Sequence, residues 1–242
     1  MLYHNVLTYL DNSVVTVRFS FGRVMLSVAV LSVSYVAPVF THSAYATPNV
    51  TNTLSISAAF EFTSLDPSKN GFIFSRMQML ETLVDVDENG LLLPALAKSW
   101  QVSDDAKTWT FELRDKVYFH DGSLMDADAV VNSLRIAQGK HGALRTAPVT
   151  SIEAVDESTV AITLSRPYIL LGAVLANYAN SVLSLDAYGK NGDVLALSGT
   201  GPYQLYQFSP PHKLVVDKFE DYWGKKASIP YASYLTGHRA ES

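Results

Sequence analysis

Cysteine is absent from the 242 residues of the chain. This absence excludes disulfide bonds, thiolate nucleophiles, cysteine-based zinc fingers and iron–sulfur clusters. Charged residues are also few, at 17%, and the formal net charge of −5 argues against a protein that binds nucleic acid through a basic surface. The remaining composition is typical of a folded globular protein, with 48% hydrophobic and 11% aromatic residues and enough length to bury a core.

Motifs for catalysis and for metal or cofactor binding are missing as well. The sequence contains no H-E-x-x-H helix motif and no G-x-S-x-G nucleophile turn. The segment at residues 199–202, Gly-Thr-Gly-Pro, lacks the Lys-Ser/Thr ending of a phosphate-binding loop. We therefore predict no catalytic residue, no metal site and no cofactor. Because a missing motif is weak support, an exported hydrolase-like enzyme on a β-rich scaffold stays open as an alternative.

The N-terminus has the pattern of a cleavable signal peptide. Arg18 and Arg23 precede an uncharged apolar run, which leads to a small-x-small cleavage site at Ala46. An uncleaved membrane anchor is the alternative, although the run is short for a membrane span. We predict that residues 1–46 are removed on export to the periplasm and that residues 47–242 form the mature protein.

Alternating apolar and polar residues predict short strands in much of the mature chain. Trp109, Phe111 and Leu113 alternate with polar residues, as expected of a strand with one buried face. The same pattern predicts strands at residues 54–58 and 117–119 and hairpins at residues 151–164 and 203–216. Beyond Ile229 the pattern ends, and no strand is predicted there.

Helical spacing of apolar residues predicts helices at residues 72–84, 126–137 and 168–178. Asp126 is the expected N-cap of the second helix. A short helical turn is predicted around residues 94–97. Together the elements indicate an α/β protein, rich in short antiparallel strands with a few helices.

Several motifs, in order along the chain, resemble the signature of a known family. The most specific is the run LPALAKSWQVSDDAKTWTFELRDKVYFHDG at residues 93–122. Leu-Asp-Pro at residues 65–67 precedes it, and Ala-Asp-Ala-Val at 127–130, Gly-Thr-Gly-Pro-Tyr at 199–203 and Asp-Tyr-Trp-Gly at 221–224 follow. The chain thereby resembles family 5 of the bacterial extracellular solute-binding proteins, the dipeptide-, oligopeptide- and nickel-binding components of ABC importers.

This resemblance implies a periplasmic binding protein type II-like fold, in which the ligand binds in a cleft between two lobes. Family members are about twice this long, in keeping with their two lobes. The resemblance therefore implies that residues 47–242 are an N-terminal part, truncated before the second lobe. It also implies a small peptide or metal-chelate ligand, an ABC permease in the inner membrane as partner, and no enzymatic activity. A nonfunctional remnant is the remaining interpretation.

The resemblance also implies where a ligand would bind. In nickel-type members an arginine in the first half of the chain can hold the carboxylates of a metal chelate by a fork-shaped contact. The candidates for this role are Arg76, Arg135 and Arg145, with Lys140 and His141 nearby. Phe72, Phe74 and Tyr178 are the candidates for an apolar wall. The alternative for each arginine is a solvated surface charge.

Overall fold

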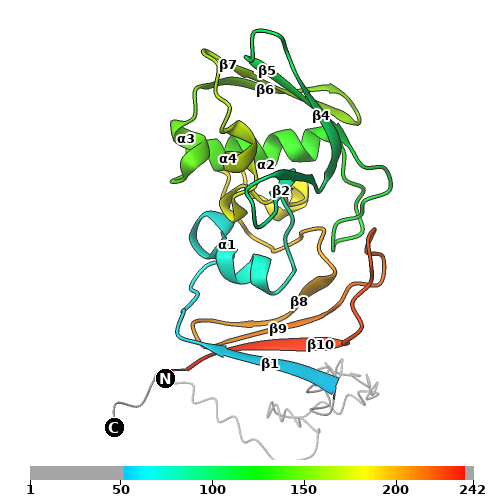
Figure 1. Cartoon of the computed structure of the whole chain (residues 1–242). Helices are drawn as coiled ribbons and strands as arrows, with labels where there is room; N and C mark the ends of the chain where they lie inside the picture. Colours follow the sequence, from blue (N-terminus) through cyan, green and yellow to red (C-terminus); the bar gives the residue numbers. More distant parts are fainter. Residues whose placement is uncertain (1–51, 238–242) are drawn as a thin grey trace, which may run out of the picture. The chain divides into compact units, whose positions relative to one another are not determined.

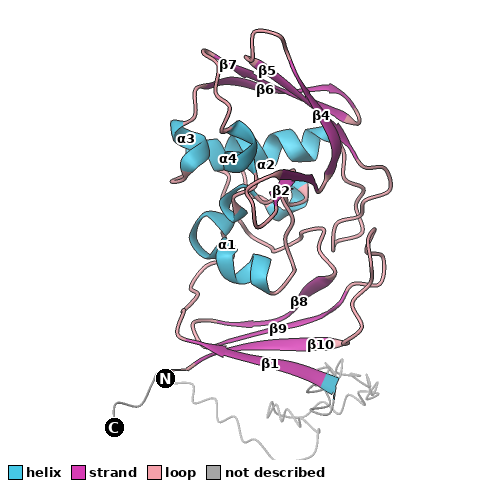
Figure 2. Ribbon diagram, viewed as in Figure 1, coloured by secondary structure: helices cyan, strands magenta, loops and turns pink. Residues whose placement is uncertain are grey.

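The computed structural model describes residues 52–237 of the chain (Figures 1 and 2). The predicted signal peptide, residues 1–46, lies outside the described residues. Within them the strands form two four-stranded sheets and a two-stranded hairpin, accompanied by short helices.

One sheet brings together the two ends of the described chain. β1 (Thr53–Ala58) pairs in parallel with β10 (Tyr231–Thr236), which is followed by β9 (Lys213–Lys218) and β8 (Tyr203–Ser209) in antiparallel order (Figure 1). This sheet confirms the predicted strand at residues 54–58 and the predicted hairpin at residues 203–216. β10 was not predicted, because consecutive buried residues at 232–234 hide the alternation of a strand.

The second sheet has one face covered by a helix. Its strands are β4 (Ala97–Val102), β5 (Thr108–Leu113), β7 (Thr159–Leu164) and β6 (Val149–Asp156), in that order and all antiparallel. Alternate residues of β5 and β7 are buried, and α2 (Ala127–Gly139) contacts β6 and β7 (Figure 2). The predicted strand at residues 109–113 and hairpin at residues 151–164 are thus confirmed.

The two longest described helices each begin at an aspartate cap. The Asp126 carboxylate accepts a hydrogen bond from the Ala129 N–H at 2.9 Å, as the sequence predicts for α2. Asp66 caps α1 (Pro67–Arg76) by accepting from the Ser68 N–H at 2.9 Å, with proline in the first turn. α1 ends well before residue 84, where the prediction placed its end, because Gln78 adopts a left-handed conformation with φ of 54°.

Three other local predictions were wrong. The expected helical turn at residues 94–97 lies between β3 (Leu92–Pro94), which pairs with β2 (Val84–Val86), and the start of β4. Within residues 168–178 only the five-residue α4 (Leu171–Leu175) forms, and a 3₁₀ turn, η2 (Tyr178–Asn180), begins at the last residue of that range. Instead of a strand at 117–119 there is a single bridge between Tyr118 and Leu124. At residues 94–97 the pairing of β3 with β2 and of β4 with β5 overrides the local pattern.

The short helices α3 (Ala143–Thr146) and η3 (Leu185–Ala187) complete the described elements. Two hydrophobic cores result. One lies between α2 and the sheet of β4, β5, β7 and β6, called the β4–β6 sheet below. The other lies between α1 and the sheet of β1, β10, β9 and β8, called the β1–β10 sheet below. The core beneath the β4–β6 sheet includes Trp109, Phe111, Leu134 and Val160, and the second includes Phe74 of α1.

The backbone segments 78–82 and 199–201 cross in close contact. This backbone crossing joins segments from both cores. The Gly201 N–H donates to the Met79 carbonyl at 3.1 Å, and an added Cβ on Gly201 would lie 2.3 Å from the Gln78 carbonyl oxygen. Only glycine permits so close an approach of two backbones. His120 holds the same glycine segment, because its Nδ1 accepts from the Gly199 N–H at 3.3 Å.

Candidate functional site

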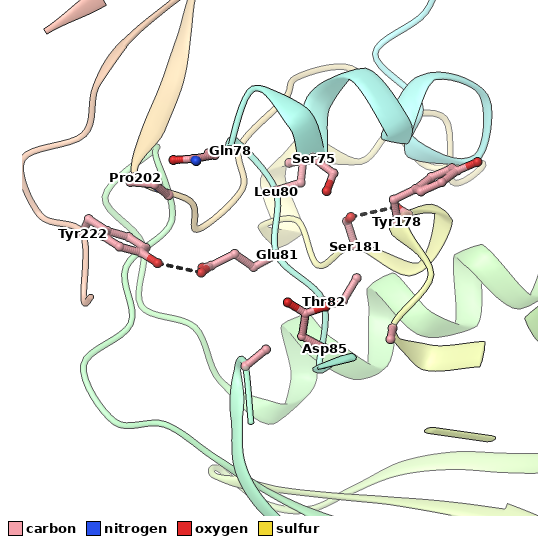
Figure 3. A pocket seen from close by; sticks show the side chains of 12 residues that line it. Ser75, Gln78, Leu80, Glu81, Thr82, Asp85, Tyr178, Ser181, Pro202 and Tyr222 are labelled. Carbon is pink, nitrogen blue, oxygen red and sulfur yellow. Dashed lines mark hydrogen bonds between the residues drawn. The ribbon is translucent and has the colours of Figure 1, made fainter. Parts of the chain in front are cut away.

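A cavity of about 280 Å³ opens beside this crossing (Figure 3). It is bounded by the end of α1, the segment that leads to β2, the turn around η2, and the loop after β9. Its lining consists of Ser75, Gln78, Leu80, Glu81, Thr82, Asp85, Ala95, Ala176, Tyr178, Ser181, Pro202 and Tyr222. Segments far apart in the sequence thus meet around a concave space. Small-molecule sites are concave and carry a few placed polar groups, and the lining of this cavity is richer in polar groups than is usual for them.

Glu81 is the most heavily bonded side chain of this lining. Its Oε1 accepts a hydrogen bond from the Tyr222 hydroxyl at 2.9 Å (Figure 3). Its Oε2 accepts from the Thr200 hydroxyl at 2.7 Å and from the Trp223 indole N–H at 2.9 Å. Burial raises the pKa of Glu81, and these three donors, which favour the ionised form, offset only part of that rise.

Arg114, which directly follows β5, contacts the same cluster of side chains. Its guanidinium lies over the Trp223 ring, 4.5 Å from the ring centroid, and its Nε donates to the Ala95 carbonyl. Burial raises the pKa of the Tyr222 hydroxyl, and the nearby Glu81 charge raises it further. The Tyr222 hydroxyl is therefore a permanent hydrogen-bond donor toward Glu81 at neutral pH.

Three of the residues predicted as ligand contacts lie together at the α1 side of the cavity. The rings of Phe72 and Tyr178 meet edge to face with centroids 6.0 Å apart, and the Arg76 guanidinium lies 5.3 Å from the Phe72 centroid. Phe60 extends this group, with its ring 5.7 Å from that of Phe72. Tyr178 lines the cavity itself, whereas Phe72 and Arg76 are exposed beside it.

The other predicted contacts lie outside the cavity lining. Lys140 forms a salt bridge with the α1 cap Asp66 at 2.6 Å, and Arg135 donates to the Ile152 carbonyl of β6 at 3.0 Å. Burial raises the pKa of Asp66, but hydrogen bonds from Lys140 and Ser68 lower it more. Both cationic side chains therefore bind groups of the fold itself, at the start of α1 and in β6.

Phe74, His141 and Arg145 complete the predicted set. Phe74 is fully buried in the core between α1 and the β1–β10 sheet, which leaves its ring no face for a ligand. His141 and Arg145 are exposed around α3. The charged residues of the cavity lining are instead the carboxylates Glu81 and Asp85.

Sequence reasoning did not find Glu81 as part of the site. Nothing in the local pattern around residue 81 distinguishes it, and its partners lie 119 to 142 residues away. The available signal was the pair of motifs at residues 199–203 and 221–224, which contain those partners. Within residues 52–237 there is no group of three or more histidine, aspartate or glutamate residues that could hold a metal ion. No helix in that range is both long and apolar enough to span a membrane.

The comparisons with known proteins agree with this architecture. Residues 92–241 match the family model described as bacterial extracellular solute-binding proteins, family 5 Middle. Among curated proteins, the glutathione-binding protein GsiB of Escherichia coli O1:K1 / APEC is 32% identical over 177 residues, 69% of this chain and 35% of its own length. The nickel-binding periplasmic protein of Escherichia coli strain K12 is 32% identical over 165 residues, 65% of this chain and 32% of its own length.

Solved structures show the same relationship. A nickel ABC transporter protein from Bacillus halodurans has a TM-score of 0.70 and 32% identity, over 78% of this chain and 39% of that one. The periplasmic binding protein DppA from Helicobacter pylori, in complex with the peptide STSA, has a TM-score of 0.67 and 27% identity, over 76% of this chain and 42% of that one. The chain thus spans about a third of the length of the curated relatives that it matches.

Proposed function

Because the chain belongs to family 5 of the bacterial extracellular solute-binding proteins, we propose that it forms part of the ligand-binding component of an ABC importer. Its fold is the α/β fold of the type II periplasmic binding proteins. The observation that carries the proposal is the polar, aromatic-walled cavity of about 280 Å³ beside the backbone crossing. In this proposal the protein binds its ligand and performs no chemistry on it.

The ligand of the proposed site is a small peptide or a metal chelate. The names of the relatives support these two classes, because they include a glutathione-binding protein, a nickel-binding protein and a structure with a bound peptide. Tyr178 forms the aromatic wall, and Phe72 and Arg76 extend it outside the cavity. Arg76, one of the arginines proposed to hold a carboxylate, contacts this wall with its guanidinium 5.3 Å from the Phe72 centroid.

The proposal also includes export of the protein to the periplasm. Residues 1–46 act as the signal peptide, residues 47–242 are the mature N-terminal part of the binding protein, and the permease of the inner membrane is its partner. N-terminal sequencing of periplasmic material tests the cleavage, with Thr47 as the expected first residue. A mature protein that begins upstream of Ala46 would contradict it.

Nuclear magnetic resonance titration of the isotope-labelled chain tests ligand binding. Glutathione, a dipeptide, a tetrapeptide and nickel with histidine are the probes, because weak binding at millimolar concentration is still detected. We expect saturable shifts in Gln78, Tyr178 and Ser181 with one class, and their loss in Tyr178→Ala. Tyr118→Ala is the matched control, because Tyr118 has the same exposure, 40% against 41%, but does not line the cavity. No saturable shift with any probe would contradict the proposal.

A further inference from the structure

We propose that Glu81 is a positioning residue of this site, which holds Tyr222 in the cavity wall and acts on the ligand only through it. Its effect on a ligand rests on the function proposed above, whereas its effect on the wall does not. The proposal follows from the three hydrogen bonds that converge on one carboxylate and from the places in the fold where their donors originate.

Both oxygens of the Glu81 carboxylate are already engaged. Oε1 accepts from Tyr222 at 2.9 Å, and Oε2 accepts from Thr200 at 2.7 Å and from Trp223 at 2.9 Å. A carboxylate has about four lone-pair directions, so three of them are used within the protein. The role left for Glu81 is therefore to fix its donors, of which Tyr222 lines the cavity and can meet a ligand (Figure 3).

The donors come from two segments that lie far from residue 81 in the sequence. Tyr222 and Trp223 lie in the loop between β9 and β10, and Thr200 lies between the two close-packed glycines of the crossing. The Trp223 ring packs against the core beneath the β4–β6 sheet, although its loop belongs to the other sheet. Glu81 thus anchors a loop of one sheet where that loop reaches the core of the other.

The Glu81 carboxylate accepts all three of these hydrogen bonds, whereas the single oxygen of a neutral amide accepts at most two. Glutamine has one acceptor oxygen, and its NH₂ group would face donors from the protein. A Glu81→Gln change therefore leaves at least one of the three donors without a partner, and buried donors without partners are unfavourable. The loop that contains Tyr222 and Trp223 is then held less firmly against residue 81.

A ligand-independent measurement tests the positioning directly. The fluorescence of Trp223 is obtained as the difference between the wild-type chain and Trp223→Phe, and the same difference is measured in the Glu81→Gln background. We expect a red-shifted Trp223 emission and stronger quenching by acrylamide in Glu81→Gln. Glu112→Gln is the matched control, because it removes the same charge from a surface salt bridge with Lys98 and leaves Trp223 untouched.

The ligand arm uses whichever probe binds in the titration proposed above. We expect Glu81→Gln to weaken its binding about tenfold, and Tyr222→Phe, which removes one of the donors, to weaken it less. If Glu81 acts through Tyr222, Glu81→Gln has a much smaller effect in a Tyr222→Ala background than in the wild-type chain. Asp85→Asn separates positioning from the charge of the cavity, because it neutralises another carboxylate of the lining. We expect Asp85→Asn to leave Trp223 emission unchanged.

The two proposals fail in different ways. If no probe binds but Trp223 emission changes in Glu81→Gln, the positioning of the wall stands and the proposed function is wrong. Unchanged Trp223 emission and quenching in a Glu81→Gln chain that still unfolds cooperatively would overturn the positioning role. Equal, additive losses of affinity in Glu81→Gln and Asp85→Asn would overturn its action through Tyr222, because they would show that charge alone matters.

Discussion

Replacement of Gly201 by alanine tests the backbone crossing that shapes the cavity. The added Cβ would lie 2.3 Å from the Gln78 carbonyl oxygen, 2.7 Å from the Met79 carbonyl carbon and 2.9 Å from that of Gln78. All three atoms belong to the backbone, so no side-chain rotation relieves the clash. Overpacking of this kind costs about 1–3 kcal/mol. If the two segments separate, the 3.1 Å hydrogen bond from the Gly201 N–H to Met79 is lost too, at a cost of about 1 kcal/mol.

The expected destabilisation of Gly201→Ala is therefore about 2–4 kcal/mol, which lowers the melting temperature by on the order of 10 °C. Urea titration should show a lower midpoint with an unchanged slope. Gly139→Ala is the control, because nothing lies within 4 Å of an added Cβ at the end of α2, and it should be neutral or stabilising by up to about 1 kcal/mol. A Gly201→Ala chain as stable as Gly139→Ala would refute the close approach.

Three further outcomes follow from the described contacts. Phe111→Ala, in the core of the β4–β6 sheet, should cost about 3–5 kcal/mol in urea titration, whereas Phe60→Ala, 61% exposed, should stay within about 0.5 kcal/mol. Asp126→Ala should cost about 1 kcal/mol through loss of the α2 cap, measured the same way. Burial lowers the pKa of His120 below 6.5, so its contribution to stability is present above 6.5 and declines as the pH falls through that value toward the lowered pKa. Melting temperatures between pH 8 and pH 5 should therefore fall more steeply in the wild type than in His120→Asn, and parallel curves would contradict this assignment.

The sequence predicted β5 and the β6–β7 hairpin of the β4–β6 sheet because one face of β5 and β7 is buried and the hairpin pairing is local, whereas β4 was not predicted as a strand. β6 and β7 form a hairpin, and buried and less buried residues alternate along β5 and β7. The cap of α2 could also be predicted, because Asp126 bonds within its own first turn. In each of these cases the residues that determine the structure are neighbours in the sequence or share a simple period.

The elements that were predicted wrongly depend on residues far apart in the sequence or on a misleading local pattern. β10 pairs with β1, as in the bond between the Ser55 and Ser233 hydroxyls, whose residues are 178 positions apart. The apolar residues Met77, Leu80 and Val84 continue the helical spacing, but Leu80 and Val84 follow the left-handed Gln78, in a segment that leads into β2. A local period cannot distinguish a helix face from an extended segment that crosses two cores.

The same contrast explains why the candidate site was only partly predicted. Phe72, Arg76 and Tyr178 belong to or adjoin short helices, and their aromatic and basic character marked them as possible ligand contacts. Arg135 and Lys140 have the same character, but they pair with a strand carbonyl and a helix cap. Residue type alone does not separate these two outcomes, because both roles use the same cationic side chains.

The segment from Gln78 to Thr82 links the cavity to the stability of the whole described fold. Its carbonyls accept hydrogen bonds from Gly201, Tyr203 and Leu96, and the Glu81 side chain accepts three more. Substitutions here should therefore change ligand binding and unfolding together, whereas Tyr178→Ala, whose ring is 41% exposed and contacts Phe72, should change binding more than unfolding. Separate measurement of both quantities distinguishes residues that contact a ligand from residues that hold those contacts in place, because the second group shifts the unfolding midpoint more.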